Sequence, residues 1–99
     1  KDMIKASEEF GLKGYVKQKS TITELKRLVK KNIPVIVDWF SPEEAGHYSV
    51  VVGFKNDEIL LADPHFGKIR KHKLEWFKER WFDIVDDKLI IREIIVIHK

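Results

Sequence analysis

The sequence predicts an α+β domain in which helices flank a mostly antiparallel sheet. Apolar residues at helical spacing fill much of the first third of the chain and return once at 74–82. Elsewhere, runs rich in β-branched and aromatic residues are separated by short turns. Helices that precede a group of strands are typical of the α+β class. Ninety-nine residues suffice for one modest core, so we expect a single domain over 1–99.

The first helix and the first strand are short. Asp2 is a suitable N-cap for a helix that runs to about Phe10, and Gly11 is a suitable stop. Residues 14–19 then have the composition of a short strand. The chain is therefore expected to enter the sheet early and to leave it for a second helix.

The second helix is expected to begin at Ser20 or Thr21, where Glu24 completes a capping box with Thr21. Asn32 ends this helix, and Pro34 keeps the following backbone extended. The buried stripe of the helix consists of Ile22, Leu25, Leu28 and Val29.

Three strands follow at 34–40, 47–54 and 58–63, according to their β-branched and aromatic content. The first two are nearly continuous in apolar residues, which predicts burial on both faces. Residues 67–73 alternate less clearly and are expected to form an exposed strand.

The last third of the chain begins with helical spacing at 74–82. Residues 85–88 ("VDDK") have the composition of a turn. We expect 89–99 to form one long final strand, because the run is dominated by isoleucine.

Overall composition excludes some classes of protein. The formal net charge of +3 comes from 19 basic and 16 acidic residues, and this is too small to indicate a nucleic-acid-binding protein. No apolar run reaches the roughly 18 residues that span a bilayer, and the first ten residues lack the apolar stretch of a signal peptide. There is no cysteine, so the chain has neither a disulfide framework nor a cysteine zinc site.

A histidine and an aspartate are predicted to meet on the hairpin formed by the second and third strands. If 55–57 is a three-residue loop, Phe54 pairs with Glu58. Counting back from this pair places His47 diagonal to Asp63 on the same face. A carboxylate at that position can accept the imidazole N–H and fix the tautomer of the ring. A two-residue turn would instead place the two side chains on opposite faces.

Neighbouring residues favour this arrangement. Pro64 holds Asp63 in extended geometry, and Gly46 lets another backbone or a substrate approach His47. Each feature alone has a simpler interpretation, since a histidine at a strand start is commonly a packing residue and an aspartate before proline commonly begins a turn. The argument for a catalytic pair therefore rests on the joint pattern.

That joint pattern resembles a known family. The segments "TELKRLVKKNIPVIVDWF", "GHYSVVVGF" and "ILLADPHFGKIRKHKLEWFKERW" are similar to the peptidase domain that removes double-glycine leaders from bacteriocins, a papain-like cysteine peptidase. The resemblance extends over about 2–82. It implies a papain-like half-domain in which His47 is the general base and Asp63 orients it. We expect Trp39, Gly46 and Tyr48 to line the substrate cleft.

The sequence also departs from that family. The nucleophilic cysteine and its oxyanion glutamine belong to an N-terminal helical segment that is not present here, and Gln18 lies in a basic strand without matching context. Two interpretations remain. The chain is either the His/Asp-bearing part of a peptidase, inactive alone, or a non-catalytic module that binds a peptide or docks on a transporter.

Expected partners follow from the resemblance. They are a peptide or protein substrate, an ABC exporter, and an N-terminal cysteine-bearing segment. Exposed apolar surface beside His47 would also allow a second copy to bind, giving a homo-oligomer. The resemblance implies a cytoplasmic location, with membrane association through a fused or partner exporter.

Other candidate sites are less well supported. Ser49 shares a face with His47 but lacks a strained elbow that would activate it, so we expect a structural role. His47, Asp63, His65 and His72 are chemically suitable for zinc, yet the chain has no HExxH-type spacing. We therefore expect neither a metal nor another cofactor.

The densest basic run, 68–73, has two interpretations. A solvated strand face that resists edge-to-edge pairing is the simpler one. A nucleic-acid patch is the rival, because Trp76 and Trp81 could stack on bases. Both tryptophans fall at helical spacing beside other apolar residues, which favours core packing and makes a nucleic-acid partner the less favoured prediction.

Overall fold

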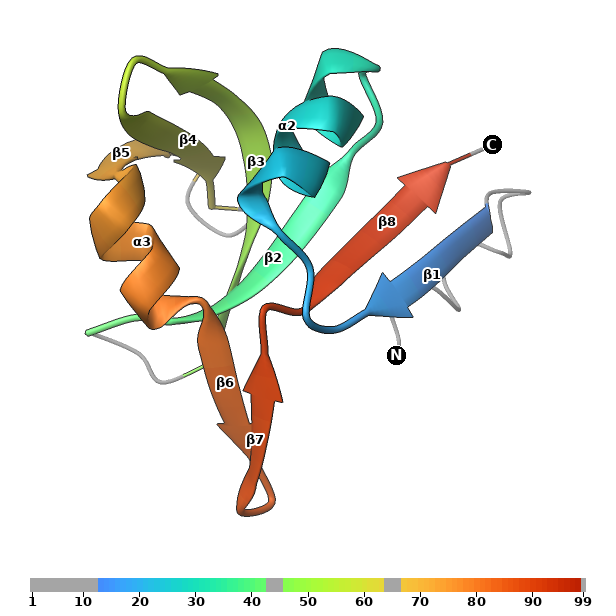
Figure 1. Cartoon of the computed structure of the whole chain (residues 1–99), viewed down its shortest axis with the longest axis vertical. Coiled ribbons are helices and arrows are strands. Elements are labelled where there is room, and N and C mark those ends of the chain that lie inside the picture. Colours follow the sequence, from blue (N-terminus) through green and yellow to red (C-terminus); the bar gives the residue numbers. More distant parts are fainter. Residues whose placement is uncertain (1–12, 43–45, 64–66, 99) are drawn as a thin grey trace.

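A six-stranded antiparallel sheet, with strand order β1-β8-β2-β3-β4-β5, forms the centre of the domain, and β6 and β7 pair separately (Figure 1). The structure, a computed structural model, describes residues 13–42, 46–63 and 67–98, so the helix predicted at 2–10 lies outside the described residues. The strands are β1 (Lys13–Lys17), β2 (Val35–Phe40), β3 (Gly46–Lys55), β4 (Glu58–Ala62), β5 (Ile69–Lys73), β6 (Phe82–Val85), β7 (Lys88–Ile91) and β8 (Ile94–His98). The helices in these residues are α2 (Ile22–Lys30) and α3 (Leu74–Arg80).

Both helices pack on one face of the large sheet, which confirms the predicted α+β class. Helix α2 lies against β2 and β3, and α3 lies against β2, β4 and β5. The core between them is made of Leu25, Leu28, Val35, Val37, Trp39, Val51, Ile59, Leu61, Phe77, Trp81, Ile94 and Val96. The two helices thus share one continuous apolar core with four neighbouring strands of the sheet.

Helix α2 begins and ends where its sequence predicts. The Thr21 hydroxyl accepts a hydrogen bond from the Glu24 backbone N–H at 3.1 Å, as in an N-cap. The Glu24 carboxylate accepts from the Lys17 ammonium at 2.9 Å and so ties the helix to β1. At the other end Asn32 takes a left-handed conformation with φ of 60°, which stops the helix before β2.

The burial of the two central strands differs from the prediction in one respect. Strand β2 is buried on both faces, as expected from its continuous apolar sequence. Strand β3 instead alternates between buried and partly exposed residues from His47 to Val52. Its outer-face apolar residues are therefore only partly covered.

The prediction of one long final strand over 89–99 is wrong. The strand breaks at Arg92, which has a φ of 47°, and the chain divides into β7 and β8. Strand β7 turns back onto β6, a strand that the sequence did not predict, while β8 lies between β1 and β2. The Arg92 N–H donates to the Trp81 carbonyl at 3.0 Å, so a tertiary contact holds the break.

None of the helices in the described part of the chain has the length and apolar content needed to cross a bilayer.

Candidate functional site

The β3–β4 turn is shorter than predicted. Lys55 pairs with Glu58, so Asn56 and Asp57 form a two-residue turn in place of the expected three-residue loop. Asn56 has a φ of 56°, a conformation that asparagine tolerates better than most residues. In a regular ladder this turn would place His47 and Asp63 on opposite faces of the hairpin.

A β-bulge restores the predicted register. Gly53 pairs with Leu60 and Val51 pairs with Leu61, so Val52 is one extra residue in β3. Its side chain is 46% exposed, in keeping with a residue that has no partner opposite it. Beyond the bulge Val50 pairs with Ala62, and the next residue pair in line is Ser49 and Asp63. The shorter turn and the bulge shift the strand register by one residue in opposite directions, so the predicted position of His47 relative to Asp63 is kept.

His47 and Asp63 consequently meet on the core face of the hairpin. Nε2 of His47 lies 2.9 Å from Oδ2 of Asp63, and the two side chains are only 7% and 1% exposed. The backbone of Asp63 is fixed as well, because its N–H donates to the Lys68 carbonyl and its carbonyl accepts from Gly67, both at 3.0 Å. This confirms the predicted proximity of the two side chains. Because an ionised carboxylate can only accept, this contact favours the ring tautomer that carries its proton on Nε2.

Trp39 supports the histidine from within the core. It stands directly opposite His47 in the β2–β3 ladder, and the two rings meet edge to face at 5.6 Å and 86°. The indole N–H of Trp39 donates to the Ser49 hydroxyl at 3.1 Å. Trp39 is 1% exposed and Ser49 is 2% exposed. Trp39 therefore contacts His47 as a buried support, and Ser49 has the structural role that its sequence context predicts.

Gly46 and Tyr48 lie on either side of His47 in β3. A Cβ atom at Gly46 would lie 2.5 Å from Oδ2 of Asp83, so the group that approaches this glycine closely is the carboxylate of a β6 residue. Tyr48 pairs with Asp38 and, because side chains alternate along a strand, faces the side of the sheet opposite His47. Within this structure only Trp39 of the three expected cleft residues is thus brought against the His47 ring.

Sequence analysis did not anticipate Arg70 at this site. Its Nη2 lies 3.7 Å from Oδ2 of Asp63, the same oxygen that His47 contacts. Arg70 pairs with Leu61 across β4 and β5, so it sits diagonal to Asp63 on the core face. The expected strand bounds, 58–63 and 67–73, would pair Asp63 with Gly67 and place Arg70 on the opposite face, so the sequence did not indicate this contact. Neither interpretation of the run 68–73, a solvated strand face or a nucleic-acid patch, gives Arg70 a place beside Asp63.

His72 is half-buried rather than simply exposed. Its ring stacks on Trp76 at 4.4 Å and 18° and also contacts Trp39 at 5.6 Å. Burial, and secondarily the nearby positive charge of Arg70, lowers the pKa of His72 below its ordinary value of 6.5. Over the described ranges, no three histidine, aspartate or glutamate side chains gather as a metal ion would require. His65, also considered as a ligand, lies outside those ranges.

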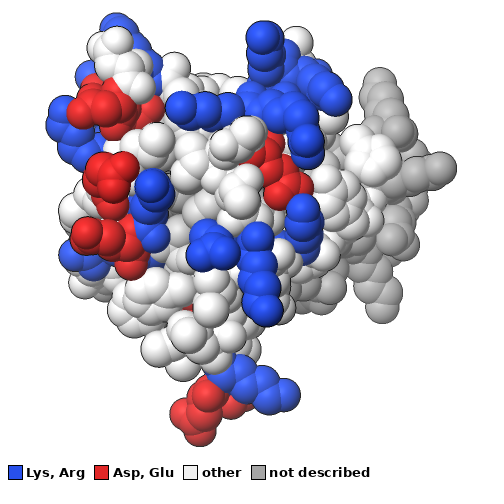
Figure 2. Space-filling model, in the orientation of Figure 1, with Lys and Arg blue, Asp and Glu red and all other residues white. Residues whose placement is uncertain are grey.

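The basic run lies on β5, at one edge of the large sheet. Lys73 pairs with Asp57 at 3.0 Å, an exposed ion pair that lowers the pKa of Asp57 and raises that of Lys73. Figure 2 shows that Lys and Arg on the face in view are interspersed with Asp and Glu along its left side. The edge strand with charged side chains fits the simpler interpretation, protection against edge-to-edge pairing.

Comparison with known proteins identifies the family. The family model described as "Peptidase_C39 like family" matches residues 2–88. The chain belongs to the Peptidase_C39 like family. This confirms the resemblance to leader peptidases that the sequence motifs predict.

One curated relative of this family member is the Lactococcin-G-processing and transport ATP-binding protein LagD of Lactococcus lactis subsp. lactis. It is 47% identical to the chain over 47 residues. The match covers 48% of the chain and 7% of the relative, so the chain corresponds to a small part of that longer protein.

Proposed function

We propose that this Peptidase_C39 like chain is the His/Asp-bearing part of a papain-like cysteine peptidase site. In this proposal His47 is the general base and Asp63 is the carboxylate that orients it. The observation that supports the proposal most directly is the buried 2.9 Å contact between Nε2 of His47 and Oδ2 of Asp63. A surface histidine or a simple turn aspartate would not require two polar side chains to be buried together.

The proposal gives different roles to the two imidazole nitrogens. Because Nε2 donates its proton to Asp63, Nδ1 is the nitrogen that takes the proton of an incoming thiol. The thiolate attacks the scissile carbonyl, and Nδ1 then returns the proton to the leaving amine. Asp63 stabilises the imidazolium formed in between and prevents the ring from turning. The thiol has to come from outside these 99 residues, which contain no cysteine.

Arg70 compensates charge at this site. A carboxylate that is 1% exposed needs partners, and Asp63 has both His47 and, at 3.7 Å, the Arg70 guanidinium. When His47 is neutral, the positive charge of Arg70 balances the negative charge of Asp63. The buried carboxylate therefore keeps a charged partner throughout the proton transfers. Trp39 closes the other side of the ring and limits its rotation.

The substrate and partner follow from the relative's name. LagD is named as a protein that processes lactococcin G and as a transport ATP-binding protein. By this likeness, together with the leader-peptidase resemblance of the sequence motifs, the proposed substrate is a peptide cleaved after a double-glycine leader, and the proposed partner is an exporter that presents the domain on the cytoplasmic side of a membrane. The narrow cleft expected for the family favours small side chains on the acyl side of the cut.

The deciding test is to read the coding sequence upstream of Lys1 and assay the longer product on a peptide with a Gly-Gly leader. We expect an encoded glutamine and cysteine, and cleavage that falls about 10²–10⁴-fold in His47→Ala. Asp63→Asn should reduce the rate less, because the amide still accepts the imidazole N–H. His98→Ala is the matched control and should leave the rate unchanged. A longer product that cleaves equally well without His47 contradicts the proposal.

A second candidate is a non-catalytic module of the same family that binds a peptide or docks on a transporter. Exposed apolar side chains on the β6–β7 hairpin, Ile84 at 54% and Leu89 at 59%, offer surface for a partner chain or a second copy. This candidate requires an upstream sequence without a cysteine and a peptide affinity that His47→Ala leaves intact. A large loss of affinity in that variant would count against it.

A further inference from the structure

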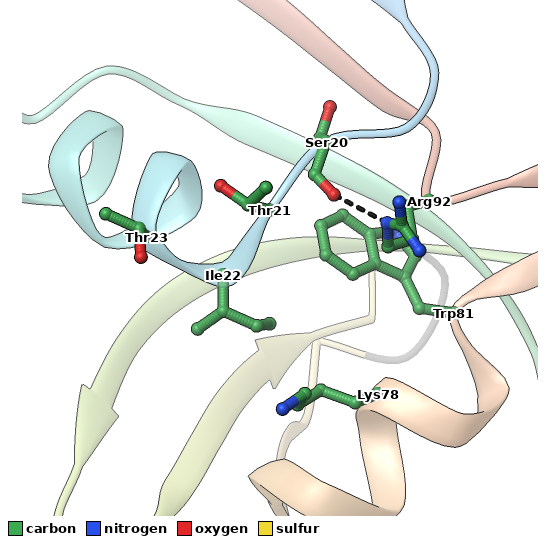
Figure 3. Close-up of a pocket in the computed structure, with 7 residues that line it drawn as sticks. All are labelled: Ser20, Thr21, Ile22, Thr23, Lys78, Trp81 and Arg92. Atoms are coloured by element: carbon green, nitrogen blue, oxygen red, sulfur yellow. Dashed lines mark hydrogen bonds between the residues drawn. The ribbon is translucent and has the colours of Figure 1, made fainter.

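A pocket of about 320 Å³ lies between the start of α2 and the end of α3 (Figure 3). Thr21, Ile22 and Thr23 form one wall, Lys78 of α3 forms another, and Trp81 and Arg92 close it. The volume is near the lower end of ligand pockets, which suits one or two side chains of a peptide better than a large cofactor. None of the residues to which the peptidase proposal gives a role lines this pocket.

Hydrogen bonds to backbone groups hold Arg92 in place before any ligand binds. The backbone N–H of Arg92 donates to the Trp81 carbonyl at 3.0 Å, and its Nε donates to the Ser20 carbonyl at 2.8 Å (Figure 3). Its left-handed φ of 47° is uncommon for a residue with a side chain, so the surrounding contacts impose it. The guanidinium is therefore held at the rim, and a ligand would not have to order it.

Most of the surface inside the pocket is apolar, although the buried Ser20 hydroxyl also belongs to the lining. The ring of Trp81 and the side chain of Ile22 lie on opposite sides of it in Figure 3. Trp81 is only 2% exposed and its indole N–H is already donated to the Glu93 carbonyl at 3.2 Å, so the small accessible part of the ring is a carbon wall. An apolar side chain that enters the pocket would gain free energy by leaving water. It would not displace the hydrogen-bond partner of the Trp81 indole N–H.

The rim carries a single sign of charge. Arg92 and Lys78 are both exposed, and among the described residues that line the pocket none is acidic. Lys78 has a Glu75 carboxylate at 3.6 Å, but that pair is at the surface, with side chains 48% and 85% exposed, and is weak. The occupant of complementary charge is a carboxylate.

We propose that this pocket docks a peptide segment in which an apolar side chain is followed by acidic residues. The apolar side chain enters between Ile22 and Trp81, while the carboxylates pair with Arg92 and Lys78. This binding site goes beyond the proposed peptidase function, because it uses none of the residues around His47. It would hold a peptide on the α2–α3 side of the domain whether or not the chain takes part in cleavage.

The test is an NMR titration of the full chain with three blocked tetrapeptides: Ser-Leu-Glu-Glu, Ser-Leu-Gln-Gln and Ser-Leu-Lys-Lys. We expect saturable shifts of the Trp81 indole N–H and of the 21–23 amides with the acidic peptide, and binding about tenfold weaker for the neutral one. Arg92→Gln should weaken acidic-peptide binding roughly tenfold and Lys78→Gln about threefold. Added salt should weaken it further.

Lys68→Gln, just before β5 and outside the pocket lining, is the matched control and should leave the affinity unchanged. Lys78→Gln alters only an exposed side chain, so it keeps the test valid if Arg92→Gln disturbs the break between β7 and β8. The proposal is overturned if the neutral peptide binds as tightly as the acidic one, if the shifts map to β5, or if no saturable shift is seen. The readout contains no cleavage step, so failure here is distinguishable from failure of the peptidase proposal.

Discussion

The β3–β4 and β6–β7 hairpins both turn at Asn or Asp residues, yet their surroundings are opposite. The first lies between β2 and β5 in the large sheet and buries Ile59 completely. The second forms a separate two-stranded sheet that projects from one end of the domain and leaves Leu89 59% exposed (Figure 1). Turn residues can start a hairpin, but neighbours on both sides decide whether it can carry a buried polar pair such as His47 and Asp63.

The largest expected effect comes from changing the register of the first hairpin. Deleting Ala62 from β4 should carry Asp63 to the opposite face and separate it from His47, because side chains alternate along a strand. Deleting Val52 from β3 should preserve the contact, because Val52 is the extra residue of the bulge and its loss leaves a regular ladder. Imidazole ¹⁵N spectra, which report whether Nε2 carries the proton, distinguish the two outcomes. Loss of the contact in both deletions would show that the bulge does not set the register.

The next effect compares core packing in the two hairpins. Ile59→Ala should lower the free energy of unfolding by about 2–5 kcal/mol, because it opens a cavity at a fully buried position. Leu89→Ala should change it by only about 0.5 kcal/mol or less, because Leu89 is already largely exposed. Urea denaturation of the two variants measures the difference. Similar losses would mean that Leu89 is covered in solution, for example by a second copy of the chain.

A smaller loss of stability is expected from a substitution where the two hairpins touch, at Gly46 and Asp83. Gly46→Ala should cost roughly 1–3 kcal/mol, since the new Cβ would lie within 2.5–2.8 Å of the Asp83 carboxyl group. Gly53→Ala, whose Cβ would meet nothing closer than 4.0 Å, should be neutral or stabilising by about 0.4–1 kcal/mol. Thermal unfolding of both variants tests this, and adding Asp83→Ala should recover much of the loss at Gly46. A cost that persists without the Asp83 carboxylate would point to another cause.

The smallest expected effect is the dependence of stability on pH through His72. Burial lowers the pKa of His72 in the folded state, whereas the unfolded chain keeps a value near 6.5, so the unfolded state binds more protons as the pH falls. The stability that His72 contributes is present above about pH 6.5 and is lost as the pH drops toward the folded-state pKa. Denaturation at about pH 7.5 and about pH 5 should show this decline, and His72→Phe should reduce it. His98→Gln, at an exposed histidine, is the control; an equal decline in His72→Phe would refute the assignment.

Local signals predicted much of the fold. The Thr21 cap, the Asn32 stop and the three central strands depend on neighbouring residues, and the structure confirms them. The His47–Asp63 contact was also predicted, but through a turn length that proved wrong and a bulge that was not foreseen. A bulge leaves little trace in a sequence, because Val52 has the same β propensity as its neighbours.

What the sequence could not predict depends on distant contacts. Nothing between Leu89 and Ile97 indicates a break, because the left-handed backbone of Arg92 is held by Trp81 and Ser20, which lie elsewhere in the chain. Likewise the close approach of Asp83 to Gly46 joins two strands whose proximity becomes evident only when the sheets are assembled. Residues that support a site from another element are therefore the ones that single-sequence reasoning misses.

The position of β8 has a kinetic consequence. Strands β2 to β5 pair with their neighbours in sequence, so this meander can form as soon as its own residues are available. Strand β1 has β8 as its partner, and more than seventy residues separate Val16 from Ile95 in the chain. During synthesis β1 must therefore wait, with one apolar edge of the nascent sheet uncovered, until β8 leaves the ribosome and inserts beside β2. Because that insertion buries Ile94, Ile95 and Val96, we expect it to be a late long-range step in folding and one open to competition from aggregation.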